Sequence, residues 1–129
     1  MTRPHVRKHF ADFPWIPGEQ LWGADGNNPA DFDIPDMGLV RVLSKDEETG
    51  AITLLIKLQA GWHTPARERH GVMQEDILIE GDCWYGDEHY EAPAYLSFPA
   101  NTWHGPMRTE TGGVWIVTLD GPATVEYDR

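Results

Sequence analysis

Hydrophobic and polar residues alternate along much of this chain with a period of two. The clearest run covers residues 51–58, where every second position is aliphatic: Ile52, Leu54, Ile56 and Leu58. Such alternation is typical of a β-strand that turns one face to the core. Further strands are predicted at residues 37–43, 76–80, 94–98 and 114–119.

Turn-forming residues separate these runs. Gly50 precedes the clearest strand, Gly81 and Asp82 end the strand at 76–80, Pro99 stops the next one, and Gly121 follows the last. No stretch of twelve or more residues shows helical periodicity. Short strands with glycine and proline between them are typical of a β-sandwich or barrel. A closed barrel also has an interior that can hold a ligand.

The N-terminal part of the chain lacks this alternation. Residues 13–36 contain four prolines and three glycines: Pro14, Pro17, Pro29, Pro35, Gly18, Gly23 and Gly26. This composition predicts an extended arm or loop rather than a helix. The length of 129 residues suits a single domain. We therefore expect an N-terminal arm over residues 1–36 and one β-barrel domain over residues 37–129.

The net charge of the chain limits the kinds of molecule that it is expected to bind. With 21 acidic and 10 basic residues, the formal net charge is −11. A surface this acidic repels nucleic acid and anionic lipid, so a cation or a neutral organic molecule is the expected partner. The longest apolar stretch, residues 52–58, is too short to span a bilayer, and no secretory signal is recognisable. Cys83 is the single cysteine, which excludes an intrachain disulfide and predicts a cytoplasmic protein.

Two short segments carry candidate metal ligands. Glu68 and His70 are two residues apart, so a strand would point both to the same side, and Gln74 has the same parity. If the segment that ends at His104 pairs with this strand, His104 faces the same interior point. Two histidines and one carboxylate suit Fe(II), and also Mn(II), Ni(II) or Zn(II), with open positions for a substrate. The amide oxygen of Gln74 can add a fourth, neutral ligand.

The spacing of these residues resembles the two motifs of the cupin superfamily. The first motif has a glycine, His-x-His, a glutamate and a second glycine, and this chain has Gly61, Glu68-x-His70, Gln74 and Gly81. The second motif is Pro-x-Gly-x-x-His, and here Pro99-x-Asn101-x-x-His104 stands in its place. The resemblance covers residues 50–120. It implies an all-β jelly-roll barrel, the cupin double-stranded β-helix, that holds one divalent metal and often forms a homodimer.

The chain departs from the family pattern at three positions. Glu68 replaces the first histidine, Gln74 replaces the glutamate and Asn101 replaces the turn glycine. Asparagine tolerates the left-handed backbone, so the change at Asn101 is mild. The other two changes together move the carboxylate from one corner of the site to another. The metal would therefore be held by Glu68, His70, Gln74 and His104.

Some assignments remain open at this point. Glu75 is an alternative to Gln74, and His63 is an alternative to Glu68 for completing the site. Glu68 also has an alternative role as a general base beside the metal. The substrate pocket is predicted from three residues next to the motifs: Trp62, His63 and Trp103.

Among small cupins, the layout resembles the acetylacetone-cleaving and dihydroxyacetophenone dioxygenases. The shared features are an N-terminal arm, the Thr49-Gly50 turn and the ending Leu-Asp-Gly-Pro at 119–122. This resemblance implies an Fe(II) dioxygenase that cleaves a small enolisable carbonyl compound or aromatic ketone, although those relatives use three histidines. One alternative is a non-redox isomerase, lyase or hydrolase acting on a small organic acid or sugar acid. Another is a metal-binding regulatory module without catalysis, similar to the cupin domain of anti-sigma factors.

Overall fold

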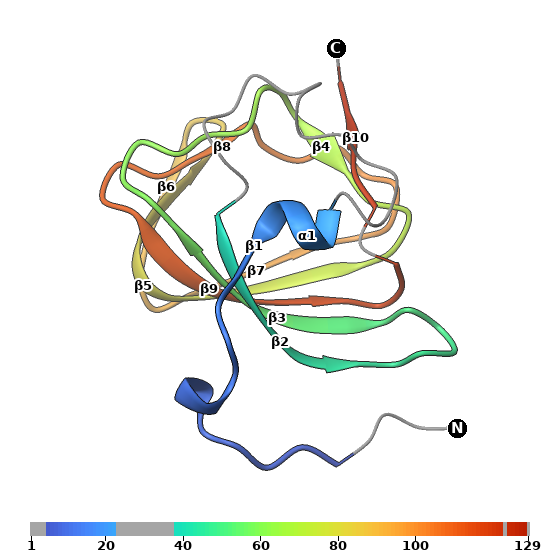
Figure 1. The fold of residues 1–129 in the computed structure, drawn as a ribbon. Helices are drawn as coiled ribbons and strands as arrows, with labels where there is room; N and C mark the ends of the chain where they lie inside the picture. The colour runs from blue at the N-terminus through green and yellow to red at the C-terminus, as the bar shows by residue number, and fades with distance from the viewer. Residues whose placement is uncertain (1–4, 23–37, 123, 129) are drawn as a thin grey trace.

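Antiparallel strands curve into a barrel in the computed structural model, which describes residues 5–22, 38–122 and 124–128 (Figure 1). The strands are β1 (Ile16–Pro17), β2 (Leu39–Lys45), β3 (Ile52–Leu58), β4 (Glu68–Arg69), β5 (Gln74–Tyr85), β6 (Glu88–Glu91), β7 (Ala94–Phe98), β8 (Met107–Arg108), β9 (Gly113–Leu119) and β10 (Glu126–Tyr127). The helical elements are the 3₁₀ turn η1 (Phe10–Asp12) and the helix α1 (Gly18–Trp22). This content confirms the all-β prediction.

One large sheet forms most of the barrel wall. Its strands run in the order β1-β2-β3-β9-β5-β6, and β7 and β8 also pair with β5. The late strand β9 therefore lies between β3 and β5, a crossover typical of jelly rolls. A second sheet contains only β10 and β4. Figure 1 shows this small sheet at the end of the barrel opposite the N-terminal arm.

The core follows from the alternation in the sequence. Leu54 of β3 is fully buried and lies opposite Val117 of β9. Val117 in turn lies opposite Asp76 of β5, so one row of inward-facing side chains crosses three strands. Lys57, at an odd position of β3, is exposed. Burying aliphatic side chains in this way stabilises a fold by roughly 25 cal/mol per Å² of apolar surface.

Strand β5 is longer than the sequence predicts. The expected stop at Gly81 and Asp82 is wrong, because the strand continues to Tyr85. The pairing of β5 with β9 shifts between Leu78 and Glu80, as in a β-bulge. At Gly81, φ is +83°, and a Cβ atom there would lie 1.9 Å from the carbonyl oxygen of Gly112. The glycine permits a close approach of two strands instead of ending one.

The N-terminal region also differs from its prediction in part. Residues 13–36 were expected to contain no helix, yet Gly18–Trp22 form a helix of five residues. A segment this short cannot show a helical period in its sequence. Ile16 pairs with Val40, which attaches the region to β2. Residues 23–36, and the predicted boundary between residues 36 and 37, lie outside the described residues.

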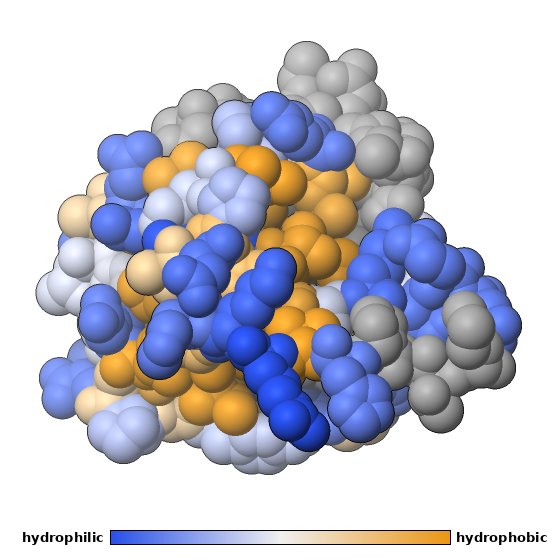
Figure 2. All heavy atoms as spheres, turned by 60° about the horizontal axis from the view of Figure 1, so that its bottom comes forward, coloured by the Kyte–Doolittle hydropathy of each residue, from blue (hydrophilic) through white to orange (hydrophobic). Residues whose placement is uncertain are grey.

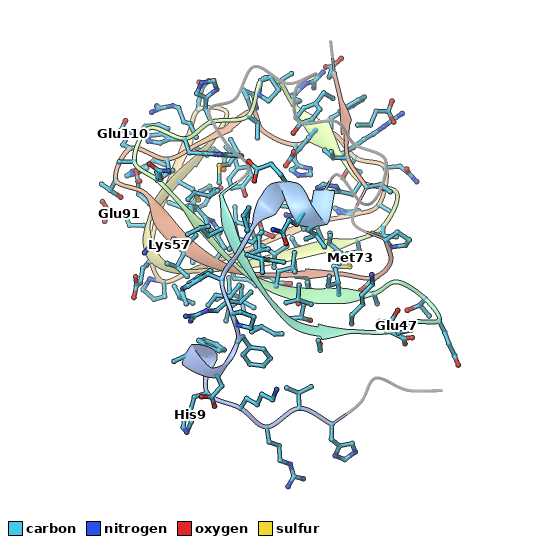
Figure 3. All side chains as sticks on the ribbon, in the orientation of Figure 1. His9, Glu47, Lys57, Met73, Glu91 and Glu110 are labelled. Carbon is cyan, nitrogen blue, oxygen red and sulfur yellow. The ribbon has the colours of Figure 1, made fainter. Side chains whose placement is uncertain are left out.

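The arm before this attachment extends away from the barrel (Figure 1). His9 in the arm and Glu47, at the tip of the hairpin between β2 and β3, both project into solvent (Figure 3). Figure 2 shows hydrophobic side chains between polar ones on the face that is turned forward there. Within the described ranges, no helix is long and apolar enough to cross a membrane.

Candidate metal centre

Three antiparallel segments bring the predicted ligands to one face. In the small sheet, Tyr127 of β10 lies opposite Glu68 of β4. On the other side of β4, Glu68 lies opposite His104. Two main-chain hydrogen bonds tie this pair, from Glu68 N to His104 O (2.8 Å) and from His104 N to Glu68 O (2.9 Å). Directly opposed residues point to the same face of a sheet, so Tyr127, Glu68 and His104 share one orientation.

His70 follows Glu68 by two residues and joins the same cluster. The Nε2 atom of His104 lies 3.5 Å from Oε1 of Glu68, and Nε2 of His70 lies 4.0 Å from it. One nitrogen or oxygen atom from each of these residues falls within 4.8 Å of the others. Among the described residues, this is the one group of three or more His, Cys, Asp or Glu side chains arranged so closely. The spacing suits a single small cation.

The histidine nitrogens offer a test of whether a cation fits. Nε2 of His70 and both ring nitrogens of His104 are buried and have no hydrogen-bond partner in the structure. Buried polar atoms without partners are rare in proteins and need an explanation. A divalent metal would satisfy a nitrogen on each ring and would offset the charge of Glu68. The cluster is therefore compatible with a divalent metal.

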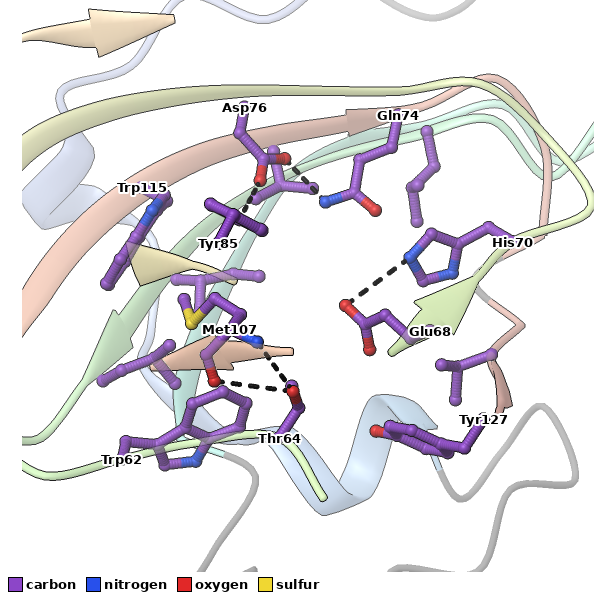
Figure 4. A pocket seen from close by; sticks show the side chains of 15 residues that line it. Trp62, Thr64, Glu68, His70, Gln74, Asp76, Tyr85, Met107, Trp115 and Tyr127 are labelled. Atoms are coloured by element: carbon purple, nitrogen blue, oxygen red, sulfur yellow. Dashed lines mark hydrogen bonds and ion pairs between the residues drawn. The ribbon is translucent and has the colours of Figure 1, made fainter. Parts of the chain in front are cut away.

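A main-chain contact fixes the ring of His70. Its Nδ1 atom lies 2.5 Å from the carbonyl oxygen of Thr124. A carbonyl can only accept, so Nδ1 carries the hydrogen and the lone pair of the neutral ring is on Nε2, the atom that faces Glu68 (Figure 4). Metal-binding histidines commonly have such a partner on the second nitrogen. The His104 ring is held differently, stacked on Phe98 with centroids 4.1 Å apart.

Gln74 is oriented by a buried carboxylate. Its Nε2 atom donates to Oδ1 of Asp76 (2.7 Å), and the Tyr85 hydroxyl donates to Oδ2 of Asp76 (3.0 Å). The amide oxygen of Gln74 is consequently turned toward His70 (Figure 4). Burial raises the pKa of Asp76 to about 6, although the hydrogen bonds from Gln74 and Tyr85 act in the opposite direction. Burial, together with the charge of Asp76, also raises the pKa of Tyr85 well above its ordinary value, which keeps it a donor.

The two alternative ligands lie elsewhere. Glu75 is next to Gln74 on β5 and therefore points outward, where it accepts a hydrogen bond from the Tyr95 hydroxyl (3.0 Å). His63 is exposed, and its Nδ1 atom contacts the Thr64 carbonyl (3.1 Å). Neither side chain belongs to the cluster of Glu68, His70 and His104. The geometry thus favours Gln74 and Glu68 for the two open positions.

Two residues of the cluster, Glu68 and His70, line the polar end of a pocket inside the barrel. The cavity is about 100 Å³ and is lined by side chains from both sheets: Ile56, Leu58, Trp62, Thr64, Glu68, His70, Gln74, Asp76, Tyr85, Met107, Trp115, Val117, Leu119, Val125 and Tyr127. Most of the wall away from the cluster is aliphatic or aromatic (Figure 4). A pocket with apolar walls and a few convergent polar groups is typical of a small-molecule site.

Only one of the three predicted pocket residues lines this cavity. Trp62 does, whereas His63 and Trp103 lie outside it. Neighbouring residues of an extended segment point to opposite sides. His63 lies between the lining residues Trp62 and Thr64, and Trp103 precedes the inward-facing His104, so both side chains point away from the cavity. Trp103 instead lies under two guanidinium groups, those of Arg69 (4.5 Å) and Arg67 (5.9 Å).

Sequence reasoning missed Asp76 and Tyr127. Asp76 could have been found from its spacing, since it follows Gln74 by two residues and shares its face. Tyr127 could not, because its place opposite Glu68 depends on pairing between distant segments. No local pattern encodes that pairing.

Solved structures that are similar to this chain differ in the activity that their names give. An acetylacetone dioxygenase from Acinetobacter johnsonii is 17% identical, with a TM-score of 0.70 over 100% of this chain and 80% of that one. A putative acetylacetone dioxygenase from Methylibium petroleiphilum is 19% identical, with a TM-score of 0.69 over 100% and 86%. The polyketide cyclase RemF from Streptomyces resistomycificus is 16% identical, with a TM-score of 0.64 over 98% and 87%. At these identities the likeness shows the fold.

Family membership comes from the sequence itself. No curated protein matches the chain. The model of the ChrR cupin-like domain, however, matches residues 32–124. The match covers both motifs, the Glu68 and His70 segment and the segment that ends at His104, and it confirms the resemblance to cupins. The chain therefore belongs to the ChrR cupin-like domain family.

Proposed function

We propose that this protein is a metal-dependent enzyme, a non-haem Fe(II) dioxygenase that cleaves a small enolisable carbonyl compound or aromatic ketone. The observation that carries the proposal is the set of unpartnered imidazole nitrogens beside the Glu68 carboxylate. Glu68 and His70 line a pocket whose walls are otherwise largely apolar, and His104 lies beside Glu68. A regulatory metal site needs no such pocket, whereas a site that binds an organic substrate does.

Each polar residue at this end of the pocket has a distinct role. Glu68, His70 and His104 would hold the metal, and the amide oxygen of Gln74 would add a neutral contact. A two-histidine, one-carboxylate set is typical of Fe(II) oxygenases. When bound, the metal supplies Lewis-acid activation of a carbonyl oxygen and, as iron, electron transfer with dioxygen. Asp76 and Tyr85 keep the Gln74 amide in one orientation through their hydrogen bonds.

The remaining wall selects the substrate by size and polarity. Trp62, Met107 and Trp115 contribute apolar surface, and the cavity of about 100 Å³ admits only a small molecule. Such walls bind the hydrocarbon part of a substrate and keep bulk water from the reacting atoms. One of the similar structures is an acetylacetone dioxygenase and another is named a putative one, and each aligns with the whole of this chain. A small β-diketone is therefore the first substrate class to test.

A non-redox reaction is the second candidate, and one observation favours it. Asp76 lies in the pocket wall, and burial raises its pKa to about 6. A carboxyl group with such a pKa can exchange protons near neutral pH, as a general acid or base does. The similar structure of a polyketide cyclase aligns with almost the whole chain as well. In this case the metal would act only as a Lewis acid.

Metal and oxygen dependence together distinguish these functions. The protein is purified without added metal, its metal content is measured, and the metal-free form is reloaded with Fe(II) or Zn(II) under argon. We expect about one metal ion per chain. Acetylacetone and hydroxyacetophenones are then supplied with and without dioxygen. Oxygen uptake coupled to substrate loss, with Fe(II) alone, supports the dioxygenase. Oxygen-independent turnover with either metal supports the second candidate, and metal binding without any turnover indicates a regulatory module.

Substitution of Glu68 separates a ligand from a general base. Glu68→Gln keeps an oxygen but removes the charge, so a ligand role predicts a lower metal content. A general-base role predicts normal metal content without turnover. Glu68→His, the residue usual in cupins, would retain the metal with one more positive charge at the site. If Glu68→Gln changes neither metal content nor turnover, Glu68 has neither role.

A further inference from the structure

The C-terminal segment, residues 124–128, meets the candidate metal centre from one side. Val125 and Tyr127 line the pocket, and the Thr124 carbonyl oxygen accepts the hydrogen bond from Nδ1 of His70. Tyr127 lies directly opposite Glu68. In Figure 4 its ring borders the pocket below Glu68 and His70. The inner face of this segment is therefore part of the site.

The outer face of the same segment is held by ion pairs. Arg69 makes a bidentate contact with Glu126, with both N–O distances 3.0 Å. Arg67 pairs with Asp128, whose backbone N–H also donates to the Arg67 carbonyl (2.9 Å). These residues alternate with the inward-facing ones, as a strand requires. Arg67 and Arg69 flank Glu68 in the sequence, so the ion pairs link the C-terminal segment to a candidate metal ligand.

The strand pairing of this segment is short. Strand β10 is two residues long and, in the described part of the chain, pairs only with β4. The side chains of Glu126 and Arg69 are 61% and 33% exposed, and surface ion pairs of this kind each contribute about 0–1 kcal/mol. The docked position of the segment thus depends on exposed ion pairs outside the pocket as well as on its contacts inside it.

We propose that the segment 124–128 is a positioning element of the metal centre. Its docking, through Arg67 and Arg69, places the Thr124 carbonyl on His70 and Tyr127 beside Glu68. The proposal rests on the metal site of the proposed function and is independent of the reaction catalysed. Loss of a hydrogen-bond partner behind a metal-binding histidine typically costs about 10- to 100-fold in metal affinity. Undocking the segment should therefore weaken metal binding while the barrel remains folded.

A charge exchange across the Arg69 and Glu126 pair tests this coupling. The probe is Co(II), titrated into the metal-free full-length protein and followed by its visible absorption. In Arg69→Glu, two acidic side chains face each other and the segment is repelled. We expect Co(II) affinity to fall about tenfold. The double variant Arg69→Glu with Glu126→Arg restores an ion pair of opposite polarity and should recover most of the affinity.

A fall of Co(II) affinity in Arg69→Glu could not be explained by the change of net charge alone. Arg69→Glu makes the surroundings of the site more negative, which by itself would raise the affinity for a cation. Arg108→Glu is the matched control, since it breaks the exposed pair with Glu110 and changes the charge equally. We expect its Co(II) affinity to stay within about twofold of the parent, because Glu110 belongs to no part of the centre.

The outcomes separate this inference from the proposal beneath it. If the parent protein binds no Co(II), the metal site itself is wrong. If the parent binds Co(II) and Arg69→Glu binds it equally or more tightly, the positioning role is wrong. The same conclusion follows if the double variant fails to recover, since Arg69 would then act through Trp103. Melting temperatures of all metal-free variants, expected within a few degrees, show that the barrel is intact.

Discussion

Two buried aspartates on β5 differ in what surrounds them. Asp76 lies beside the pocket and is 2% exposed, and Asp82 lies just after the bulge and is 5% exposed. Burial alone raises the pKa of both carboxyl groups. For Asp76 it prevails, and the pKa reaches about 6. For Asp82, hydrogen bonds from Thr111 and others outweigh burial and hold the pKa well below its ordinary value.

The number of donors explains this difference. Oδ1 of Asp82 accepts four hydrogen bonds, from the backbone N–H groups of Glu110 and Thr111 and from the hydroxyls of Thr109 and Thr111. Its Oδ2 atom lies 2.9 Å from Nε2 of His89. Asp76 has two donors, one on each oxygen. A carboxylate surrounded by donors fixes a loop, whereas one with few donors stays able to exchange a proton.

The largest expected effect is on metal affinity and tests the role of the pocket, where Asp76 lies. His104→Ala removes one ring of the candidate site, and the metal affinity should fall by more than about 100-fold, beyond the usual cost of losing a supporting partner. Far-ultraviolet circular dichroism should still report a β-protein. Asp82→Asn is the contrasting variant and should keep its metal within about twofold. Full metal retention in His104→Ala would contradict the assignment.

The next effect is on stability and tests Asp82, which lies just after the bulge in β5. Asp82→Asn exchanges the charged acceptor for an amide, and we expect the free energy of unfolding to fall by about 2–3 kcal/mol. Because the folded pKa is lowered, Asp82 contributes stability above its ordinary pKa of 3.8 and loses it as the pH falls below that value. The difference between parent and variant in urea unfolding should therefore shrink in acid. A difference that is constant with pH would show that the charge is unimportant.

A smaller effect of opposite sign is expected at Asp76. Its folded pKa is raised from 3.8 to about 6, so its contribution to stability is present below 3.8 and is lost as the pH rises through 6. Asn does not titrate. In the metal-free protein at pH 8, Asp76→Asn should therefore raise the free energy of unfolding by about 1–2 kcal/mol. Urea unfolding near pH 4 should show little difference, and destabilisation at pH 8 would contradict the raised pKa.

The smallest effect sharpens the account of Asp82. His89 is one-third exposed and stacks on Trp84, with ring centroids 4.5 Å apart. His89→Ala leaves the four donors to Oδ1 in place. We expect the free energy of unfolding to fall by about 0.5–1 kcal/mol, as for a partly exposed ion pair. A loss equal to that of Asp82→Asn would assign the stabilisation of this carboxylate to His89 instead of to the 109–111 loop.

The sequence predicted those parts of the fold that alternation encodes. The strand expected at 94–98 is β7, and those expected at 51–58 and 114–119 match β3 and β9 to within one residue. Alternation failed at Gly81, because a glycine that permits a bulge looks the same as one that ends a strand. It also gave no signal for β4, β8 and β10, which are two residues long. Their pairing depends on distant segments.

The site was predictable to the same extent. Spacing predicted that Glu68 and His70 share a face, and the two motifs predicted that His104 approaches them. The structure brings the three together, while their role as metal ligands stays a prediction. Parity could have excluded Glu75 and Trp103, which lie next to Gln74 and His104. The contribution of Thr124 to the site has no sequence signal, because it comes from a carbonyl group that every residue has.

The paired main-chain hydrogen bonds between Glu68 and His104 have an evolutionary consequence. The backbone alone sets the separation of these two positions, so a mutation can exchange the side chain at either without moving the other. A carboxylate at position 68 can therefore take the place of an imidazole while the main chain keeps the two positions at the same separation. Descendants of one barrel can in this way exchange ligands and acquire new chemistry before the scaffold itself has to change.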